Sequence, residues 1–168
     1  MWKRLLVPCD FSACADAALA LAIELARAHG AELSLLHVSD LPPNLEADAR
    51  ITPPDGAEPM RVADYVTRGA AARLETVAKP AREAGLTVFV HAVTGDVATE
   101  ILRVADEQAA SAVVIGTHGR TGLSHLLLGS VAEKVVRAAK VPVVTVRLPG
   151  PEARATEEER AAEDELAG

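Results

Sequence analysis

Five short apolar runs alternate with four segments of helical periodicity, and this alternation limits most strongly the fold that the chain can adopt. The apolar runs are residues 4–8, 32–38, 87–93, 111–116 and 141–147. The helical segments are residues 12–29, 60–84, 96–109 and 130–139. Because strands that alternate with helices form parallel sheets through right-handed crossovers, the sequence predicts a doubly wound α/β fold: a five-stranded parallel sheet with helices on both faces.

Two strand ends indicate where such a sheet would hold a ligand. The first apolar run ends at Pro8 and is followed by Asp10, and the fourth ends at Gly116 and continues to Gly119. In doubly wound sheets ligands bind outside the carboxyl ends of the strands, where the winding direction reverses. A strand order of 3-2-1-4-5 makes the first and fourth strands neighbours at that reversal. We therefore expect this order and a ligand site between the two strand ends.

Capping residues predict where several helices begin and end. Ser12 and Asp96 precede the first and third helices, where their side chains can accept hydrogen bonds from unpaired N–H groups. Gly30 follows the first helix, at the position that favours a left-handed end. Ser130 is expected to open the fourth helix. Glu133 would complete a capping box there by reaching back to the Ser130 amide.

The connection after the second strand is rich in proline. Residues 40–59 hold five of the ten prolines, which predicts a long irregular connection rather than an element. Because this connection leaves the ligand side of the sheet, we expect it to be mobile without ligand and to cover part of the ligand. Gly69 and Pro80 interrupt the helical segment that follows, and a kink or break is expected there.

Composition restricts the class of protein. The chain has 168 residues, 49% of them hydrophobic, and no apolar run approaches the ~20 residues that cross a bilayer. Its start lacks a signal-peptide core, so we expect a cytoplasmic protein without a membrane partner.

Cys9 and Cys14 are expected to be free, buried and unreactive. A net charge of −7 argues against nucleic acid as a partner, because contacts from Lys and Arg to phosphate dominate such binding.

Negative charge is concentrated at the end of the chain. Residues 151–168 hold seven acidic side chains against Arg154 and Arg160, and almost no large apolar ones. Such a segment cannot bury enough surface to offset the entropy that it loses on ordering. We expect one domain over residues 1–148 and a disordered or loosely helical acidic tail over residues 149–168. A dedicated interaction arm is the alternative for the tail.

Glycines dominate the segment between the fourth strand and the fourth helix: Gly116, Gly119, Gly122 and Gly129. Glycine lacks a Cβ atom and allows positive φ, so backbone N–H groups can turn toward an anion. The N-terminus of the following helix adds partial positive charge at the same place. The side chains of this loop that can be cationic are His118, Arg120 and His125. A phosphate held by backbone donors fits this pattern better than a site built on clustered charge.

The glycine spacing excludes two common nucleotide-binding loops and matches a third. There is no G-x-x-x-x-G-K-[ST] sequence, and the glycines do not form G-x-G-x-x-G. They follow the pattern G-x-x-G, nine residues, then G-S, at Gly116, Gly119, Gly129 and Ser130. This pattern resembles the ATP-binding motif of the universal stress protein family. The stretches "RLLVPCDFS" and "LLHV" extend the resemblance over roughly residues 3–147.

The resemblance implies roles for particular residues. Asp10 would contact the adenosine portion, the Val38 backbone would contact adenine, and the glycine loop with Ser130 would hold ribose and phosphates. The expected ligand is ATP, with or without Mg²⁺. The full set of implied contacts is Pro8, Asp10, Val38, Ile115, Gly116, His118, Gly119, Arg120, Gly129, Ser130 and Val131. Simpler readings stay open: Asp10 could cap the next turn, His118 and Arg120 could be solvated, and the glycine loop could bind nothing.

No catalytic pattern accompanies the motif. The sequence shows no Ser-His-Asp signature and no Cys and His at metal-ligand spacing. His37 and His91 lie in predicted strands and are expected to be satisfied core or surface histidines. We therefore expect a nucleotide-binding stress-response module. Slow ATP hydrolysis or nucleotidyl transfer, and a ligand-free dimeric scaffold, are the alternatives. The resemblance also implies a homodimer through the strand from Val141 to Arg147, where Pro142 suits a sheet edge.

Overall fold

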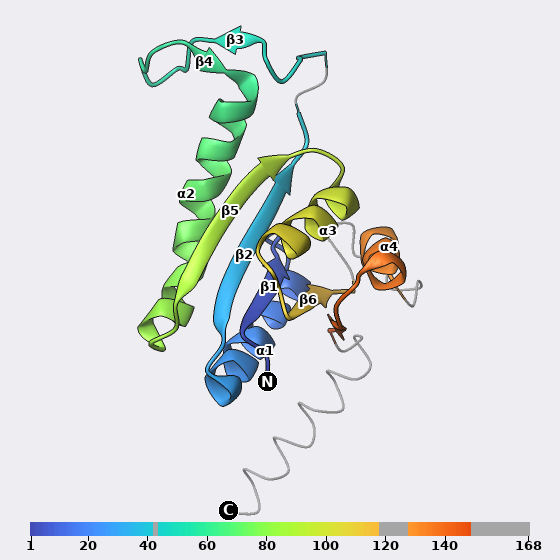
Figure 1. The fold of residues 1–168 in the computed structure, drawn as a ribbon. Coiled ribbons are helices and arrows are strands. Elements are labelled where there is room, and N and C mark those ends of the chain that lie inside the picture. Colours follow the sequence, from blue (N-terminus) through green and yellow to red (C-terminus); the bar gives the residue numbers. More distant parts are fainter. Residues whose placement is uncertain (42–43, 118–127, 149–168) are drawn as a thin grey trace, which may run out of the picture.

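The five apolar runs form one parallel sheet in the expected order (Figure 1). A computed structural model of the chain describes residues 1–41, 44–117 and 128–148. The strands lie in the order β5-β2-β1-β6-β7, and every neighbouring pair is parallel. Counted along the chain, these five strands have the order 3-2-1-4-5, which confirms the prediction. Their bounds are β1 (Arg4–Pro8), β2 (Glu32–Ser39), β5 (Val88–Thr94), β6 (Ala112–Gly116) and β7 (Val143–Val146).

Alternate side chains of the strands belong to two cores, one on each face of the sheet. The helices are α1 (Ala13–His29), α2 (Val62–Glu83), α3 (Val97–Glu107) and α4 (Ser130–Ala138). In β1, Leu5 and Val7 pack in a core with residues of α1 and α2, whereas Leu6 packs in a second core with residues of α3 and α4. Because successive side chains of a strand point to opposite faces, the two helix pairs cover opposite sides. The doubly wound α/β class is confirmed.

The expected ends of two helices are confirmed. The N–H of Ala15 donates to Ser12 Oγ at 3.2 Å, and the N–H of Thr99 donates to Asp96 Oδ1 at 3.0 Å. Both side chains therefore satisfy a donor that the first turn of a helix leaves unpaired. Gly30 follows α1 with φ of 63°, in the left-handed region that glycine adopts without strain.

The expected capping box at the start of α4 is wrong. Gly129 is the residue that caps the helix, with an extended backbone, and Ser130 is the first helical residue. Glycine has no side chain that could accept a hydrogen bond, so the N-cap residue gives no side-chain cap. The Glu133 N–H donates to the Gly129 carbonyl at 2.9 Å in the first hydrogen bond of the helix. The Glu133 carboxylate pairs with Arg137 at 2.9 Å instead of reaching back.

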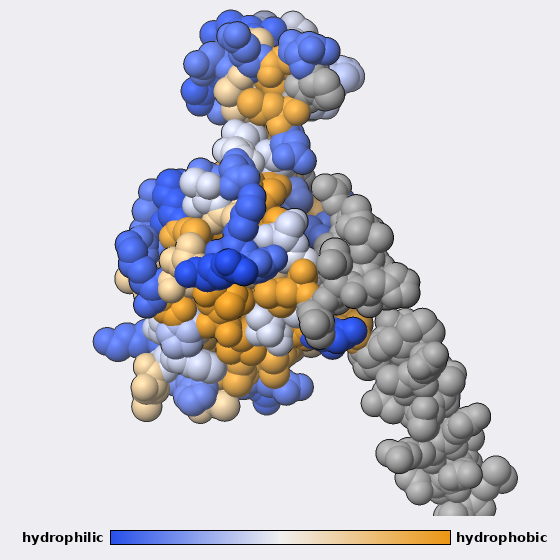
Figure 2. Space-filling model, turned by 90° about the vertical axis from the view of Figure 1, so that its right-hand side faces the viewer, coloured by the Kyte–Doolittle hydropathy of each residue, from blue (hydrophilic) through white to orange (hydrophobic). Residues whose placement is uncertain are grey.

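The connection after β2 contains structure that the sequence does not predict. Two short strands, β3 (Arg50–Ile51) and β4 (Met60–Arg61), form an antiparallel pair. The Arg50 guanidinium donates to the Pro59 carbonyl at 2.9 Å and strengthens this pairing. The expectation of a wholly irregular connection is therefore wrong. Helix α2 begins at Val62, and not at residue 60, because Met60 and Arg61 belong to β4. The β3–β4 hairpin stands clear of the body of the molecule (Figures 1 and 2).

Helix α2 is continuous, so of the kink or break expected at Gly69 and Pro80 the break is wrong, and the kink stays a prediction. Leu74, Ala78 and Ala81 are buried in the core against the sheet and hold the second half of the helix in place. Pro80 lies in the last turn of α2. Proline lacks an N–H and so removes one helical hydrogen bond, but few residues of the helix remain after this position. Tertiary packing therefore outweighs the weak helical propensity of these two positions.

Strand β7 lies at one edge of the sheet, as Pro142 suggests. Val143, Val144 and Val146 in this strand are half-buried. Figure 2 looks onto the side of the molecule where α4 and β6 lie in Figure 1, and apolar side chains gather there. No helix in the described ranges is long and apolar enough to cross a membrane. The acidic tail, residues 149–168, lies outside the described residues.

Candidate functional site

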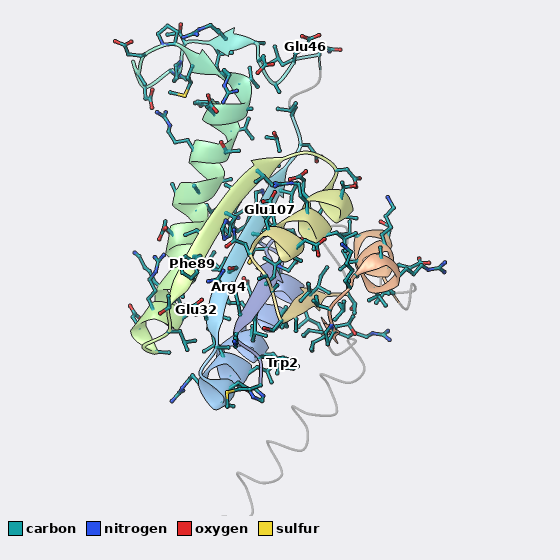
Figure 3. All side chains as sticks on the ribbon, in the orientation of Figure 1. Trp2, Arg4, Glu32, Glu46, Phe89 and Glu107 are labelled. Atoms are coloured by element: carbon teal, nitrogen blue, oxygen red, sulfur yellow. The ribbon has the colours of Figure 1, made fainter. Side chains whose placement is uncertain are left out.

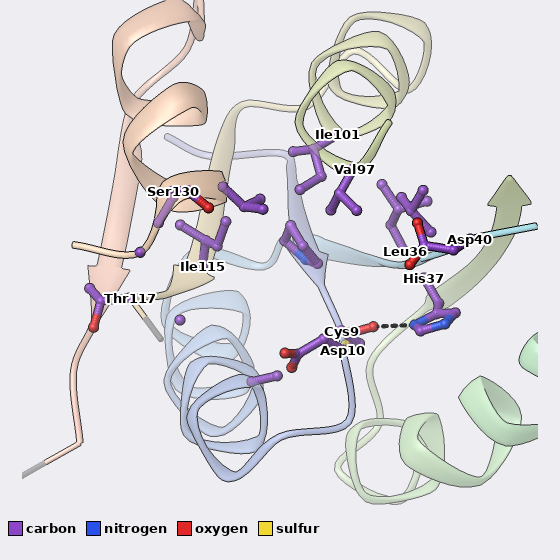
Figure 4. A pocket seen from close by; sticks show the side chains of 17 residues that line it. Cys9, Asp10, Leu36, His37, Asp40, Val97, Ile101, Ile115, Thr117 and Ser130 are labelled. Atoms are coloured by element: carbon purple, nitrogen blue, oxygen red, sulfur yellow. Dashed lines mark hydrogen bonds between the residues drawn. The ribbon is translucent and has the colours of Figure 1, made fainter. Parts of the chain in front are cut away.

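A cavity of about 310 Å³ opens at the carboxyl ends of β1, β2 and β6 (Figure 4). The chain brings together eight of the eleven expected contact residues around it: Pro8, Asp10, Val38, Ile115, Gly116, Gly129, Ser130 and Val131. The other three, His118, Gly119 and Arg120, lie outside the described residues. The two strand ends that the sequence singles out, after β1 and after β6, thus face the same space.

One wall of the cavity is apolar (Figure 4). It is formed by Leu36 and Ile115 from the sheet and by Val97 and Ile101 from α3. Val97 and Ile101 are four residues apart, so they share one face of the helix. Leu36 and Ile101 belong to the core between the sheet and α3, and core packing therefore fixes the shape of this wall. An apolar wall of this kind suits the flat face of a heteroaromatic ring.

Polar side chains also line the cavity: Asp10, His37, Asp40, Thr117 and Ser130. The N–H of Ser12 donates to Asp10 Oδ1 at 3.0 Å. Asp10 therefore does cap the turn that follows it, as the simpler reading of the sequence holds. A carboxylate has acceptor sites beyond one hydrogen bond, so this cap is compatible with a contact to ligand.

Backbone hydrogen bonds join the two ends of the glycine loop. The Gly129 N–H donates to the Thr117 carbonyl at 2.7 Å, and the Thr117 N–H donates to the Val146 carbonyl at 2.8 Å. The end of β6, the edge strand β7 and the N-terminus of α4 are thereby connected. Ser130 and Val131 line the cavity at that N-terminus, where the helix dipole and the first N–H groups favour an anion.

Both cysteines are free and buried, as the sequence predicts. Burial raises the pKa of the Cys9 thiol to about 12, and the negative charges of Asp16 and Asp10 add to the increase. The Cys14 thiol donates to the Val146 carbonyl at 3.2 Å. Because the thiolate is the reactive form of cysteine, Cys9 lines the cavity without being a nucleophile at neutral pH.

The two strand histidines differ. His37 Nδ1 lies 2.6 Å from the Cys9 carbonyl oxygen, and since a carbonyl only accepts, Nδ1 is the donor. His37 is therefore satisfied, as expected. The same expectation is wrong for His91, whose Nε2 is buried without a hydrogen-bond partner in the described part of the chain. Burial and then the positive charge of Arg4 lower the pKa of His91, while Glu107 opposes the decrease.

Several residues that line the cavity were not predicted from the sequence: His37, Asp40, Val97, Ile101 and Thr117. Val97 and Ile101 carried a signal, because they are an apolar pair at helical spacing after the third main strand. Asp40 and Thr117 carried none, since only the lengths of β2 and β6 place them there. Of the described residues in the connection 40–59, Asp40 lines the cavity. The described residues hold no group of three potential metal ligands.

Comparisons with known proteins agree with this architecture. The model of the universal stress protein family matches residues 1–147. The universal stress protein MJ0531 of Methanocaldococcus jannaschii is 32% identical over 149 residues, which cover 89% of this chain and 84% of that protein. The universal stress protein YxiE of Bacillus subtilis is 32% identical over 155 residues, which cover 88% of this chain and all of that protein.

A solved structure has the same fold. The protein MJ0577, also from Methanocaldococcus jannaschii, superimposes with a TM-score of 0.70 and 26% identity. The match covers 89% of this chain and 99% of that one. The order of the strands and the placement of the helices are therefore those of a known protein architecture.

Proposed function

The chain belongs to the universal stress protein family, and from this premise we propose that its cavity binds an adenine nucleotide, with ATP as the ligand. The observation that carries the proposal is the convergence of eight residues, assigned from the family resemblance, on one cavity at the switch point of the sheet. The cavity volume of about 310 Å³ falls within the usual size of small-molecule sites, roughly 300–1,000 Å³.

The two ends of the cavity complement the two ends of a nucleotide: the apolar wall suits the base, and the N-terminus of α4 suits the anionic phosphates. We place the adenine ring against Val97 and Ile101, with the Val38 backbone at its edge. Asp10 then meets the sugar. The phosphates lie toward Ser130, at the N-terminus of α4, where backbone donors and the helix dipole stabilise negative charge. A Mg²⁺ ion, where present, would be held first by these phosphates.

Solved structures of related proteins support an adenine nucleotide rather than another anionic ligand. One universal stress protein with this fold has been solved in complex with cAMP. Another, from Archaeoglobus fulgidus, has been solved in complex with dAMP. Both ligands carry adenine attached to a sugar phosphate, which is the part of ATP that the apolar wall and Asp10 would contact in this chain.

We further propose that the module is a homodimer whose ligand state partner proteins read. The exposed edge of β7 supports the dimer, because an edge strand with apolar side chains pairs readily with its twin. A ligand-free scaffold is the second candidate. It is favoured by the hydrogen bond from Ser12 to Asp10, which gives Asp10 a structural role without any nucleotide.

Calorimetric titration of the full chain with ATP, adenosine and GTP tests the proposal. We expect ATP and adenosine to bind and GTP to bind more weakly, because the apolar wall and the Val38 backbone would read the base. Absence of binding by both adenine compounds, with the dimer intact, would leave the scaffold as the better reading. Steady release of phosphate from bound ATP would instead favour the enzymatic alternative.

A further inference from the structure

The turn that carries Asp10 has an unusual backbone at its next residue. Phe11 has φ of 63°, in the left-handed region that bulky L-residues rarely adopt. Such a conformation persists only where surrounding contacts hold it. Phe11 stands between Asp10, which lines the cavity, and Ser12, whose N–H donates to Asp10 Oδ1. The conformation of Phe11 therefore sets where the Ser12 N–H stands relative to the Asp10 carboxylate.

Two side chains from other elements hold the Phe11 ring. The His37 ring, at the end of β2, lies 4.5 Å from the Phe11 ring between centroids, with 34° between the planes. The Arg73 guanidinium, from α2, lies 3.9 Å from the centre of the same ring. The first contact is an aromatic pair and the second a cation–π contact. Phe11 thus connects the turn to β2 and to α2.

The residue before Asp10 is fixed from the same direction. The His37 Nδ1 donates to the Cys9 carbonyl at 2.6 Å, and the Cys9 N–H donates to the Leu36 carbonyl at 2.7 Å. His37 therefore holds the turn twice, through a hydrogen bond before Asp10 and through its ring after Asp10. Figure 4 shows the first of these contacts beside the Asp10 side chain.

We propose that Phe11, His37 and Arg73 form a positioning unit that fixes the Asp10 turn and so sets the Asp10 carboxylate for the nucleotide. The proposal has two halves. The first half, that the unit fixes the turn, concerns the protein without ligand. The second half, that the turn sets Asp10 for the nucleotide, rests on the proposed function. Arg73 makes α2 part of the arrangement, although none of the residues that line the cavity belongs to α2. Residues outside the cavity thereby influence affinity.

Nucleotide affinity tests the second half. Arg73→Ala removes an exposed side chain, and we expect it to weaken ATP and adenosine alike, by about two- to five-fold, the worth of one exposed cation–π contact. Lys79→Ala, which removes another exposed cation of α2, is the matched control and should bind like the parent. Phe11→Tyr keeps the ring and should also bind like the parent, whereas Phe11→Gly permits the same positive φ without the ring and should bind more weakly.

Amide hydrogen exchange without ligand tests the first half. The Ser12 N–H reports the turn directly, because it donates to Asp10 Oδ1. We expect its exchange to accelerate by about two- to five-fold in Arg73→Ala and to stay unchanged in Lys79→Ala. The Thr99 N–H, which donates to Asp96 Oδ1 in a similar cap on α3, is the internal control and should not change.

The two measurements separate the possible failures. Unchanged Ser12 exchange in both Arg73→Ala and Phe11→Gly overturns the positioning unit. Faster exchange with unchanged affinity overturns its link to the nucleotide. If the parent binds no adenine compound, the proposed function fails, and the exchange of Ser12 still decides whether the unit fixes the turn.

Discussion

Gly116 at the end of β6 lies so close to Cys14 of α1 that an added Cβ atom would stand 3.0 Å from the backbone carbonyl and the Sγ of Cys14. Real Cβ contacts are rarely so short. The glycine that opens the loop motif therefore has a packing role of its own, in addition to any contact with a ligand. This close approach brings the start of α1 and the end of β6 to the same edge of the cavity.

The first prediction follows from this contact. We expect Gly116→Ala to destabilise the protein by about 1–3 kcal/mol in urea unfolding, because extra atoms in a packed site force shifts of the backbone. Cys14→Ala should not restore stability to that variant, since the Cys14 backbone is as close as its side chain. Gly69→Ala is the control: an added Cβ there meets nothing within 4 Å, and the change should stabilise α2 by up to about 1 kcal/mol.

The second prediction concerns the two ends of the nucleotide. Asp10→Ala should weaken ATP and adenosine by similar factors, about 10-fold, because both ligands carry the group that Asp10 would contact. Asp10→Asn keeps an acceptor for the Ser12 N–H and separates the loss of the cap from the loss of charge. Gly119→Val, at a position outside the described residues, should remove most of the preference for ATP over adenosine.

Titration calorimetry of both ligands against these variants, with thermal unfolding as a check on the fold, measures the difference. If Gly119→Val bound ATP as the parent does, the glycine loop would be structural.

The orientation of backbone groups along β7 allows a sharp test of the dimer. The Val113 N–H in β6 donates to the Pro142 carbonyl, and the Thr117 N–H just after β6 donates to the Val146 carbonyl, four residues further along. Because backbone groups of a strand alternate in direction, the N–H of Thr145 points away from β6, toward the open edge. Among the described strands β6 is the one neighbour of β7, so this N–H faces the side where a second subunit would pair.

The third prediction is that Thr145→Pro makes the protein monomeric with little loss of stability, since proline removes only the outward N–H. Val144→Pro is the matched control. It removes an N–H directed at β6 and should lower the stability of the monomer itself. Light scattering at micromolar concentration gives the mass, and a parent that is already monomeric would contradict the proposed dimer.

The fourth prediction concerns pH. His91 and Phe89 are two residues apart in β5, so they share the face of the sheet that α3 covers. The Arg4 guanidinium lies 4.8 Å from the centre of the Phe89 ring and pairs with Glu32 (Figure 3). Burial, with the charge of Arg4, lowers the pKa of His91 below its ordinary value of 6.5. The neutral imidazole is therefore favoured in the folded protein, and the unfolded chain binds the proton more readily.

Stability should accordingly decrease as the pH falls below about 6.5 and through the lower pKa of the folded protein. His91→Phe should flatten this part of the profile, because it removes the titrating group and the buried nitrogen without a partner. Urea unfolding across pH 5 to 8 measures it. Equal slopes for parent and variant in this interval would contradict the assignment to His91.

The sequence by itself was enough to predict the five strands of the main sheet, the four helices and the edge of the sheet where the cavity opens, but not the β3–β4 pair. Ser12, Asp96 and Gly30 act within one turn of their own position, so local pattern suffices to predict them. The position of the cavity followed from the residues after the first and fourth main strands, because parallel strands bring their carboxyl ends to one edge.

Only the tertiary structure decided which residues meet across that edge. Gly116 is close to Cys14 and Phe11 contacts Arg73 because separate helices pack on one face of the sheet, and no local pattern encodes such distances. Helix α2 continues through Pro80 because the burial of its neighbours outweighs propensity. That His91 Nε2 is buried without a hydrogen-bond partner among the described residues could not be predicted either. The contacts of a buried atom depend on segments far away in the sequence, whereas periodicity and capping depend on neighbours along the chain.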